Sequence, residues 1–350
     1  MPDTPIYALT YPASTGLVTD GATNMQTICT DVETALNVQA SANDGRNQLD
    51  NPRFGTNFRN TQTITAGSTG YIADRWVWNT ANITATWTRP TLAIGTSGLD
   101  SSITFSAQSV VTTSTVNNAT SYIQQLLDGG VEKLGGRTVV LSFYAKSTSG
   151  TPKVGARLVQ NFGTGGAPSA EVVGTFQTVT ISTSWTRYSL SFTMASVSGK
   201  TLGSNGDDAT RLELWTAGGS GTVAAAVGNQ QGFTIDITGV QLEFAYLTPF
   251  ELRYDWIDQL RCQRYFQTSY QDSVWVLGGG VVGGVGKVQI TTTTNGSGVA
   301  YYSTRFAVAM PRVPTFRFYT QAAGTVGSWD YARSGASGTI TIAPSSPSGS

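Results

Sequence analysis

The sequence predicts an all-β protein: a jelly-roll β-sandwich followed by a second, smaller β-sandwich domain, with a short helical N-terminal segment and a linking helix. Forty glycines among 350 residues, with abundant Thr, Ser and Asn, are typical of short strands joined by tight turns. Aromatic residues make up 10% and hydrophobic residues 39% of the chain, which favours packed cores over disorder. Many short segments alternate apolar and polar residues, the period of a half-buried strand.

Residues 1–46 are predicted to form a separate N-terminal segment for anchoring or oligomerisation. Prolines bracket an extended stretch from Pro5 to Pro12. Thr19 or Asp20 can cap a helix that runs to about Asn37. The apolar stripe of this helix has too little of its own chain to pack against. It therefore docks either on the following domain or on another copy or partner protein.

Residues 47–247 are predicted to form the jelly roll, because strand patterns and turn residues alternate along them as in an all-β sandwich. One helix is expected to interrupt the strands, capped by Asn117 or Asn118 and ended by Gly129 and Gly130. The expected strands are 61–64, 76–78, 83–89, 102–107, 138–146, 153–162, 175–181, 186–193, 210–215 and the closing pair 233–238 and 240–244.

The closing segment organises the rest of the chain. Its two alternating stretches are separated by Gly239, and Thr248-Pro249 ends them because proline has no donor for a β-ladder. The period then changes, since Leu252, Trp256 and Leu260 recur every four residues along one face of a helix. We expect this helix to lead into the C-terminal β-domain, residues 248–350, with strands at 274–277, 285–293, 299–308 and 315–320.

Several short motifs, in order and spacing, resemble bacteriophage tail-fibre and virion-appendage proteins that contain a carbohydrate-binding-module-like jelly roll. The resemblance covers about residues 50–320 and is strongest at the junction between the two β-domains. The residues that carry it there are Asp236, Gln241, Leu242, Glu243, Thr248, Pro249, Phe250, Glu251, Cys262, Gln263, Arg264 and Tyr265. Ala73 to Trp76, Leu141 to Lys146 and Met310 to Thr315 fit the same family.

The resemblance implies a phage virion structural protein, made in the host cytoplasm and located in the virion. It implies a tail fibre or similar appendage that attaches to the particle by its N-terminus and contacts host-surface polysaccharide through its β-domains. The expected partners are two further copies in a homotrimer and other virion proteins of the tail or capsid. The alternative is a head fibre, capsid-decorating protein or adaptor that binds no glycan.

Sugar binding by such a jelly roll needs aromatic platforms. Trp78, Trp87, Trp185 and Trp215 are the candidate ligand-binding residues, although most tryptophans of a sandwich belong to its core, so one or two at most are expected to be exposed. No metal site is predicted. A structural calcium between the first and last strands would use Asn51 and Asp236, but the acidic cluster usual near the first strand is missing.

Composition excludes several function classes. The chain contains no histidine, which removes histidine-dependent nucleophiles, proton shuttles and His-ligated metals. With 21 basic and 21 acidic residues, it lacks the basic excess of a nucleic-acid binder. No apolar run is long enough to span a bilayer, so membrane insertion is not expected. Acidic residues are sparse and β-helix repeats are not visible, so we expect no enzyme activity, no catalytic residue and no cofactor; a polysaccharide depolymerase is the less favoured alternative.

Overall fold

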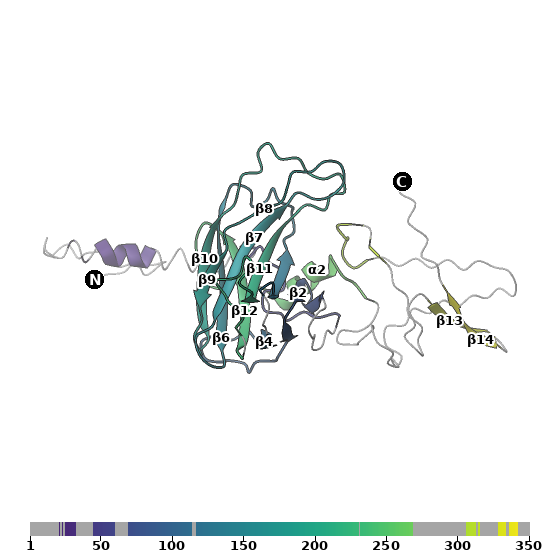
Figure 1. Cartoon of the computed structure of the whole chain (residues 1–350), viewed down its shortest axis with the longest axis horizontal. Coiled ribbons are helices and arrows are strands. Elements are labelled where there is room, and N and C mark those ends of the chain that lie inside the picture. The colour runs from purple at the N-terminus through teal and green to yellow at the C-terminus, as the bar shows by residue number, and fades with distance from the viewer. Residues whose placement is uncertain are drawn as a thin grey trace, which may run out of the picture.

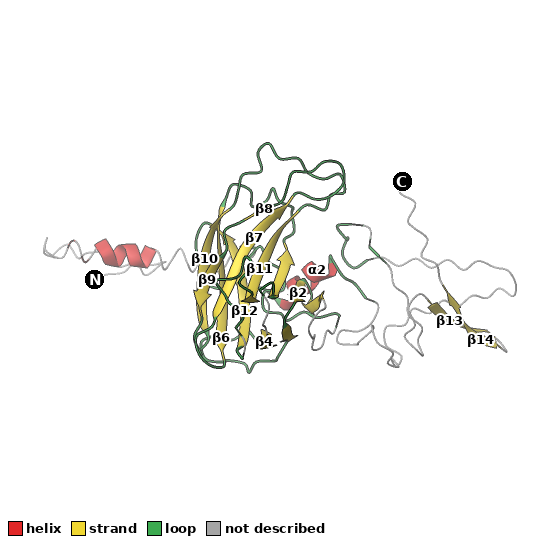
Figure 2. Cartoon of the chain, viewed as in Figure 1, coloured by secondary structure: helices red, strands yellow, loops and turns green. Residues whose placement is uncertain are grey.

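The computed structural model confirms a β-sandwich with very few helices (Figures 1 and 2). It describes residues 21, 23, 25–32, 45–59, 69–113, 117–230, 232–268, 306–312, 314–315, 328–333 and 336–341. Within these residues, two antiparallel sheets stack face to face and a separate hairpin is formed near the C-terminus.

The larger sheet has seven strands in the order β1-β2-β5-β11-β7-β8, with β9 also paired to β7. Its strands are β1 (Thr69–Ala73), β2 (Trp76–Ala81), β5 (Thr120–Leu126), β7 (Lys153–Asn161), β8 (Val172–Val173), β9 (Gln177–Thr180) and β11 (Ala209–Gly218). The smaller sheet has five strands in the order β10-β6-β12-β4-β3. Its strands are β3 (Thr84–Thr88), β4 (Ala107–Thr113), β6 (Thr138–Ser147), β10 (Thr186–Thr193) and β12 (Thr234–Phe244).

The core lies between the two sheets and follows from alternation along each strand. On β6, Val139, Leu141 and Phe143 point inward, and on β11 Leu212 and Leu214 meet them from the opposite sheet. Each of these side chains is fully buried. At about 1.5–3 kcal/mol for each large apolar side chain removed from water, burial between the sheets is the main stabilising term of the sandwich.

The helix expected after Asn117 is wrong: this segment is strand β5, paired between β2 and β11. Ser121, Ile123 and Gln125 alternate inward, so the true period is two. Gln125 hides this period in the sequence because it is a buried polar residue. Its amide is satisfied by the backbone of Asp50, which accepts from Gln125 Nε2 at 2.8 Å and donates to Gln125 Oε1 at 2.7 Å.

The closing pair is one strand, β12, rather than two. Gly239 has φ +55 and lies at an irregularity in the pairing with β6 between Thr238 and Gln241. A glycine in the left-handed region is a common way to form a bulge that shifts the register without ending the ladder. A Cβ at Gly239 would also lie 2.7 Å from the Tyr144 ring. The predicted break is therefore a bulge.

The other strand predictions differ mainly in their bounds. The strand expected at 102–107 is displaced, since β4 begins at Ala107 and the preceding residues form only the isolated bridge of Phe105 with Thr91. β1 was not expected. The strand expected at 61–64, those at 274–277 and 285–293 and most of those at 299–308 and 315–320 lie outside the described residues. In the predicted C-terminal domain the described strands are β13 (Ser328–Arg333) and β14 (Ala336–Thr341), an antiparallel hairpin.

The linking helix is confirmed as α2 (Asp255–Gln263), and its apolar face is not the face that packs on the sandwich. Trp256 and Leu260 are exposed, whereas Asp258 and Cys262 are buried against the sandwich. The apolar spacing therefore marks a helix without marking its buried face. A second helical stretch lies between residues 21 and 32, within the helix expected from Thr19 or Asp20 to Asn37. Neither helix in the described part of the chain is long and apolar enough to cross a membrane.

Candidate functional site

The four tryptophans predicted as sugar platforms are all buried. Trp78 and Trp87 are 0% exposed, Trp215 is 3% and Trp185 is 8% exposed. Trp78 and Trp87 point into the core from β2 and β3, where large rings fill the space between the sheets. None of the four therefore presents an exposed ring face, which agrees with the expectation of one or two at most. Among the tryptophans whose side chains are described, Trp256 on α2 is exposed.

The outer face of the five-stranded sheet is partly covered by two chain segments. The loop before β4 reaches the residue that precedes β10, since a Cβ at Gly98 would lie 2.6 Å from the carbonyl oxygen of Trp185. The segment after β12 folds back over its own strand, where the Thr248 amide donates to Glu243 Oε1 at 2.9 Å and Gln241 Nε2 donates to the Pro249 carbonyl at 3.2 Å. These segments lie over part of this face, whereas Ser189 and Ser191, which face outward from the edge strand β10, are exposed.

The outer face of the seven-stranded sheet carries a row of aromatic rings. Trp215 on β11 faces outward and stacks on Tyr122 of β5, its register partner, with ring centroids 4.2 Å apart. Phe176, just before β9, meets the other side of Trp215 edge to face at 6.1 Å. Ala224 and Val227 complete the cover over Trp215. Tyr122 and Phe176 are only half-buried, so they are the accessible members of the row.

Gly155 leaves the space that the Phe176 ring occupies. It lies opposite Trp215 in the pairing of β7 with β11. A Cβ at this position would lie 2.3 Å from Cζ of Phe176 and 2.7 Å from Cγ2 of Val227. The absence of a side chain therefore lets the ring lie against the strand, which is one of the recognised uses of glycine inside a sheet.

Next to the aromatic row, a buried carboxylate holds two arginines. Glu213 is 1% exposed and accepts from Nε of Arg157 at 2.6 Å, from Nε of Arg211 at 2.8 Å and from the indole of Trp215 at 2.9 Å. Three donors satisfy a charge that would otherwise be costly to bury. Burial raises the pKa of the Tyr122 hydroxyl and the Glu213 carboxylate raises it further. Tyr122 is therefore a neutral hydroxyl over the physiological pH range.

These residues form a surface with three parallel rows, which we call the Glu213 shelf. The first row is aromatic and the second is polar. The third row runs from the exposed Leu126 through Arg211 and the buried Val159 to the exposed Val173. The first and third rows are four residues apart along β11, about 14 Å at the usual rise of a strand. The shelf consists of Tyr122, Gln124, Leu126, Arg157, Val173, Phe176, Arg211, Glu213 and Trp215.

The shelf has the chemistry that a hydroxylated ring needs. Half-buried aromatic rings offer apolar contact at low entropic cost, while fixed arginines, an amide and a phenol offer hydrogen bonds. The arginines are held in place by Glu213, so binding need not order them. Sequence reasoning missed all of these residues except Trp215. The alternation along β7 and β11 was the available signal, but it does not tell which of the two faces of a strand is open.

The oxygen ligands considered for calcium are occupied by the protein itself. Asn51 Oδ1 accepts from the Thr56 amide at 3.0 Å, and its Nδ2 donates to the carbonyls of Thr56 and Asp74. Asp236 accepts from Ser106 and Gln108, both at 3.0 Å, and burial raises the pKa of its carboxyl group. Over the described ranges no three Cys, Asp or Glu side chains gather as a metal site would require.

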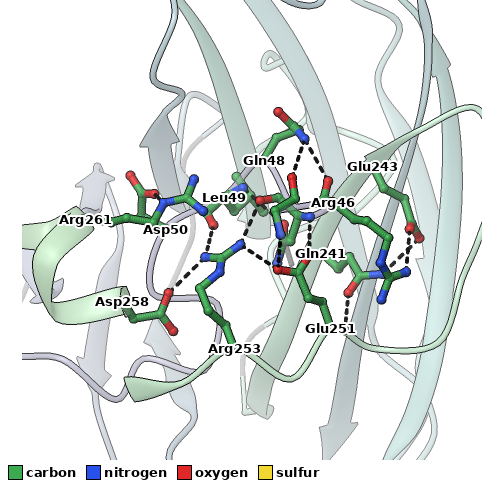
Figure 3. A network of polar contacts seen from close by, with 12 residues as sticks. Arg46, Gln48, Leu49, Asp50, Gln241, Glu243, Glu251, Arg253, Asp258 and Arg261 are labelled. Carbon is green, nitrogen blue, oxygen red and sulfur yellow. Dashed lines mark hydrogen bonds and ion pairs between the residues drawn. The ribbon is translucent and has the colours of Figure 1, made fainter. Parts of the chain in front are cut away.

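A second arginine–carboxylate cluster lies where the chain leaves the sandwich (Figure 3). Arg253 is 3% exposed and pairs with Glu251 at 3.2 Å and Asp258 at 2.9 Å. Its remaining donors reach the carbonyls of Leu49 at 3.1 Å and Asn47 at 2.9 Å. Figure 3 shows the guanidinium enclosed between these groups. This cluster, which we call the Arg253 junction, fastens α2 and the segment before it to residues 47–49, so its role is structural.

Comparison with known families gives one match. Residues 93–210, about a third of the chain, match a family described as a carbohydrate binding domain. The matched range includes Tyr122, Arg157 and Phe176 of the shelf and ends just before Arg211. No curated protein sequence matches the chain.

Three solved structures illustrate the structural likeness. A putative sugar binding protein from Bacteroides thetaiotaomicron is 13% identical, with a TM-score of 0.35, over 57% of this chain and 100% of that one. The family 11 carbohydrate-binding module from Clostridium thermocellum, in complex with a β-1,3-1,4-mixed-linked tetrasaccharide, is 9% identical with a TM-score of 0.31, over 54% and 98%. The enzymatically active domain of tailspike protein 4 of bacteriophage CBA120 is 16% identical with a TM-score of 0.32, over 57% of this chain and 22% of that chain.

Proposed function

We propose that this protein binds glycans through the Glu213 shelf. The observation that carries the proposal is the row of aromatic rings, two of them half-buried, beside arginines held by a buried carboxylate on the outer face of the seven-stranded sheet. The family match supports it, because the matched range contains six of the nine shelf residues. The shelf works by binding rather than by cleavage, since its buried carboxylate is fully engaged by three donors.

The biological setting is a phage virion, as the sequence resemblance implies. The protein is a tail fibre or similar appendage, assembled as a homotrimer in the virion and attached to the particle by residues 1–46. Its sandwich contacts host-surface polysaccharide. Light scattering on the purified chain is expected to give the mass of three copies, and a monomeric mass would contradict the trimer.

Affinity electrophoresis of the full chain in gels that contain single bacterial polysaccharides tests the glycan function. A glycan that retards the wild-type chain should retard the Tyr122→Ala and Phe176→Ala variants much less, because each removes an accessible ring of the row. Tyr254→Ala is the matched control, since Tyr254 is 70% exposed and lies outside the shelf. Equal retardation of all four chains would remove the shelf from the binding site.

A second candidate function is an adaptor that binds other virion proteins and no glycan. It is favoured by the exposed apolar side chains around α2, Leu252, Trp256 and Leu260, because such a patch often marks a protein contact. Light scattering with and without residues 1–40 tests it. The deletion must end before Gly45, whose amide donates to Glu251 Oε1 at 2.8 Å. A chain that is monomeric in both forms and retarded by no glycan would favour the adaptor.

A further inference from the structure

We propose that the glycan bound by the Glu213 shelf is anionic and that Arg157 binds its carboxylate or sulfate group. This inference rests on the proposed glycan function and adds the charge class of the ligand and the residue that recognises it. It starts from the different carboxylate partners of the two shelf arginines.

Among the nitrogens of Arg157, only Nε makes a hydrogen bond with the described part of the protein. That nitrogen donates to Glu213 Oε2, and among the described residues the two η nitrogens have no hydrogen-bond partner. Both η nitrogens retain contact with solvent, and the Arg157 side chain as a whole is 16% exposed. The guanidinium carbon lies 5.7 Å from the centre of the Trp215 ring, which limits the side chain to a position beside the aromatic row. Two parallel donors in a fixed plane match the two oxygens of a carboxylate or sulfate.

Arg211 is committed further. Its Nε donates to Glu213 Oε1, and its Nη1 lies 3.6 Å from Glu171 Oε2. Asn161 Nδ2 donates to the same carboxylate of Glu171 at 3.1 Å. The 3.6 Å separation is an ion pair rather than a hydrogen bond, so among the described residues neither arginine uses its η donors in a hydrogen bond. Arg157 differs from Arg211 because Glu213 is its one carboxylate partner there, whereas Arg211 has Glu171 as a second.

The charge of the residues around Glu213 agrees with an anionic ligand. Core residues Val154 and Ala156 point inward, so Lys153 and Arg157 point outward from β7, as Arg211 and Glu213 do from β11. With Glu171 before β8, these residues are three cations and two carboxylates, a local sum of +1, in a chain whose formal net charge is zero. One of the carboxylates, Glu213, is buried below the arginines, so the accessible charge is more positive than the sum. A carboxylate placed at Arg157 would lie about two strand residues from the aromatic row, within the reach of one sugar ring.

The test uses the full chain and matched pairs of polymers. Polygalacturonate, alginate and hyaluronan are the acidic probes, and galactan, mannan and lichenan are the neutral ones. Each acidic polymer is also prepared with its carboxyl groups reduced to primary alcohols, which removes the charge and keeps the sugar backbone. We expect retention of at least one acidic polymer, a tenfold or greater loss of affinity for its reduced form, and weakening by salt because screening reduces an exposed charge contact.

Three variants assign the effect to a residue. Arg157→Gln should lower the affinity for the acidic polymer at least tenfold and lower the affinity for its reduced form much less, because a neutral hydroxyl loses only one hydrogen-bond donor. Arg211→Gln removes an equivalent ion pair from Glu213 and should have a much smaller effect. Arg137→Gln, which removes an exposed arginine beside the Phe244 ring of the other sheet, is the control for net charge. Thermal unfolding of each variant verifies that it folds.

The outcomes separate the two proposals. Equal affinity for an acidic polymer and its reduced form, or binding of neutral polymers only, would overturn the anionic ligand and keep the glycan function. Equal losses in Arg157→Gln and Arg211→Gln would overturn the assignment to Arg157. If no polymer of either class were bound, the proposed glycan function itself would fail.

Discussion

The Glu213 shelf and the Arg253 junction are built from the same groups and have different consequences. In each, carboxylates that are almost fully buried pair with arginine side chains. At the junction all the η donors of Arg253 are consumed, half by carboxylates and half by backbone carbonyls, so nothing remains for a ligand. On the shelf, Glu213 takes only the ε nitrogens of its two arginines. A buried ion pair therefore indicates a binding site only when part of the pair still faces solvent.

The position of the two clusters in the fold explains this difference. The junction joins chain segments about 200 residues apart in sequence. The buried backbone carbonyls of Asn47 and Leu49 need hydrogen-bond donors, and Arg253 supplies them. The shelf lies on a sheet whose ladders already satisfy the backbone. Its side chains are therefore free to serve a ligand, and the predictions below test this distinction.

Breaking the junction should have the largest effect on stability. Arg253→Ala leaves Glu251 and Asp258 as buried carboxylates with fewer partners and frees the carbonyls of Leu49 and Asn47. We expect the free energy of unfolding to fall by about 3–5 kcal/mol, measured by urea unfolding. Arg157→Ala should cost clearly less, because Arg211 and Trp215 still hold Glu213. A smaller loss for Arg253→Ala than for Arg157→Ala would reverse the comparison.

A side chain at Gly155, in the space that the Phe176 ring occupies, should distort the shelf and leave the contacts of the Arg253 junction unchanged. In Gly155→Ala the new methyl group collides with Phe176 and Val227, so we expect a loss of about 1–3 kcal/mol in stability and a reduced affinity for glycan. Gly55→Ala is the control, because a Cβ at Gly55 would have no neighbour within 4 Å. The double variant Gly155→Ala/Phe176→Leu should recover stability and not affinity. Recovery of both would show that the ring contributes nothing to binding.

The smallest effect is expected at the edge of the junction, where Tyr265 donates to Asp128 Oδ1 at 2.7 Å. Tyr265→Phe should lower stability at pH 8 by about 1 kcal/mol, the net contribution of one hydrogen bond. Burial raises the pKa of Tyr265 to about 12, against an ordinary value near 10, with a further contribution from the hydrogen bond to Asp128. The stabilisation is therefore complete below pH 10 and is lost as the pH rises through 12.

Urea unfolding of the wild-type chain and the Tyr265→Phe variant at a series of pH values measures this loss. The difference between them should be constant from pH 8 to 9.5 and shrink towards pH 12. The pKa of Asp128 is shifted in the opposite direction. Burial alone would raise this pKa, but the hydrogen bond from the Tyr265 hydroxyl and the charge of Arg264 outweigh burial and lower it. Asp128→Asn should therefore flatten the loss of stability as the pH falls below about 4. A difference between wild type and Tyr265→Phe that does not change up to pH 12 would contradict the raised pKa.

The amino-acid sequence by itself determined the all-β class and the approximate positions of β6, β7, β10 and α2. These segments have strong local patterns, since alternation in a strand or four-residue spacing in a helix is a property of neighbouring residues. The mistakes lie where a local pattern is ambiguous. In β5 the buried Gln125 conceals the alternation, and on α2 the apolar residues face away from the sandwich.

Only the tertiary structure decided which side chains form the shelf. Tyr122, Arg157, Phe176 and Glu213 come from four separate segments and become neighbours only because β5, β11 and β7 pair in one particular register. Local sequence cannot tell the two faces of such a strand apart, and the predicted tryptophans show this, since Trp78 and Trp87 point into the core while Trp215 points outward under a loop. Whether a face is open depends on what the rest of the chain places over it, which is a property of long-range packing rather than of neighbouring residues.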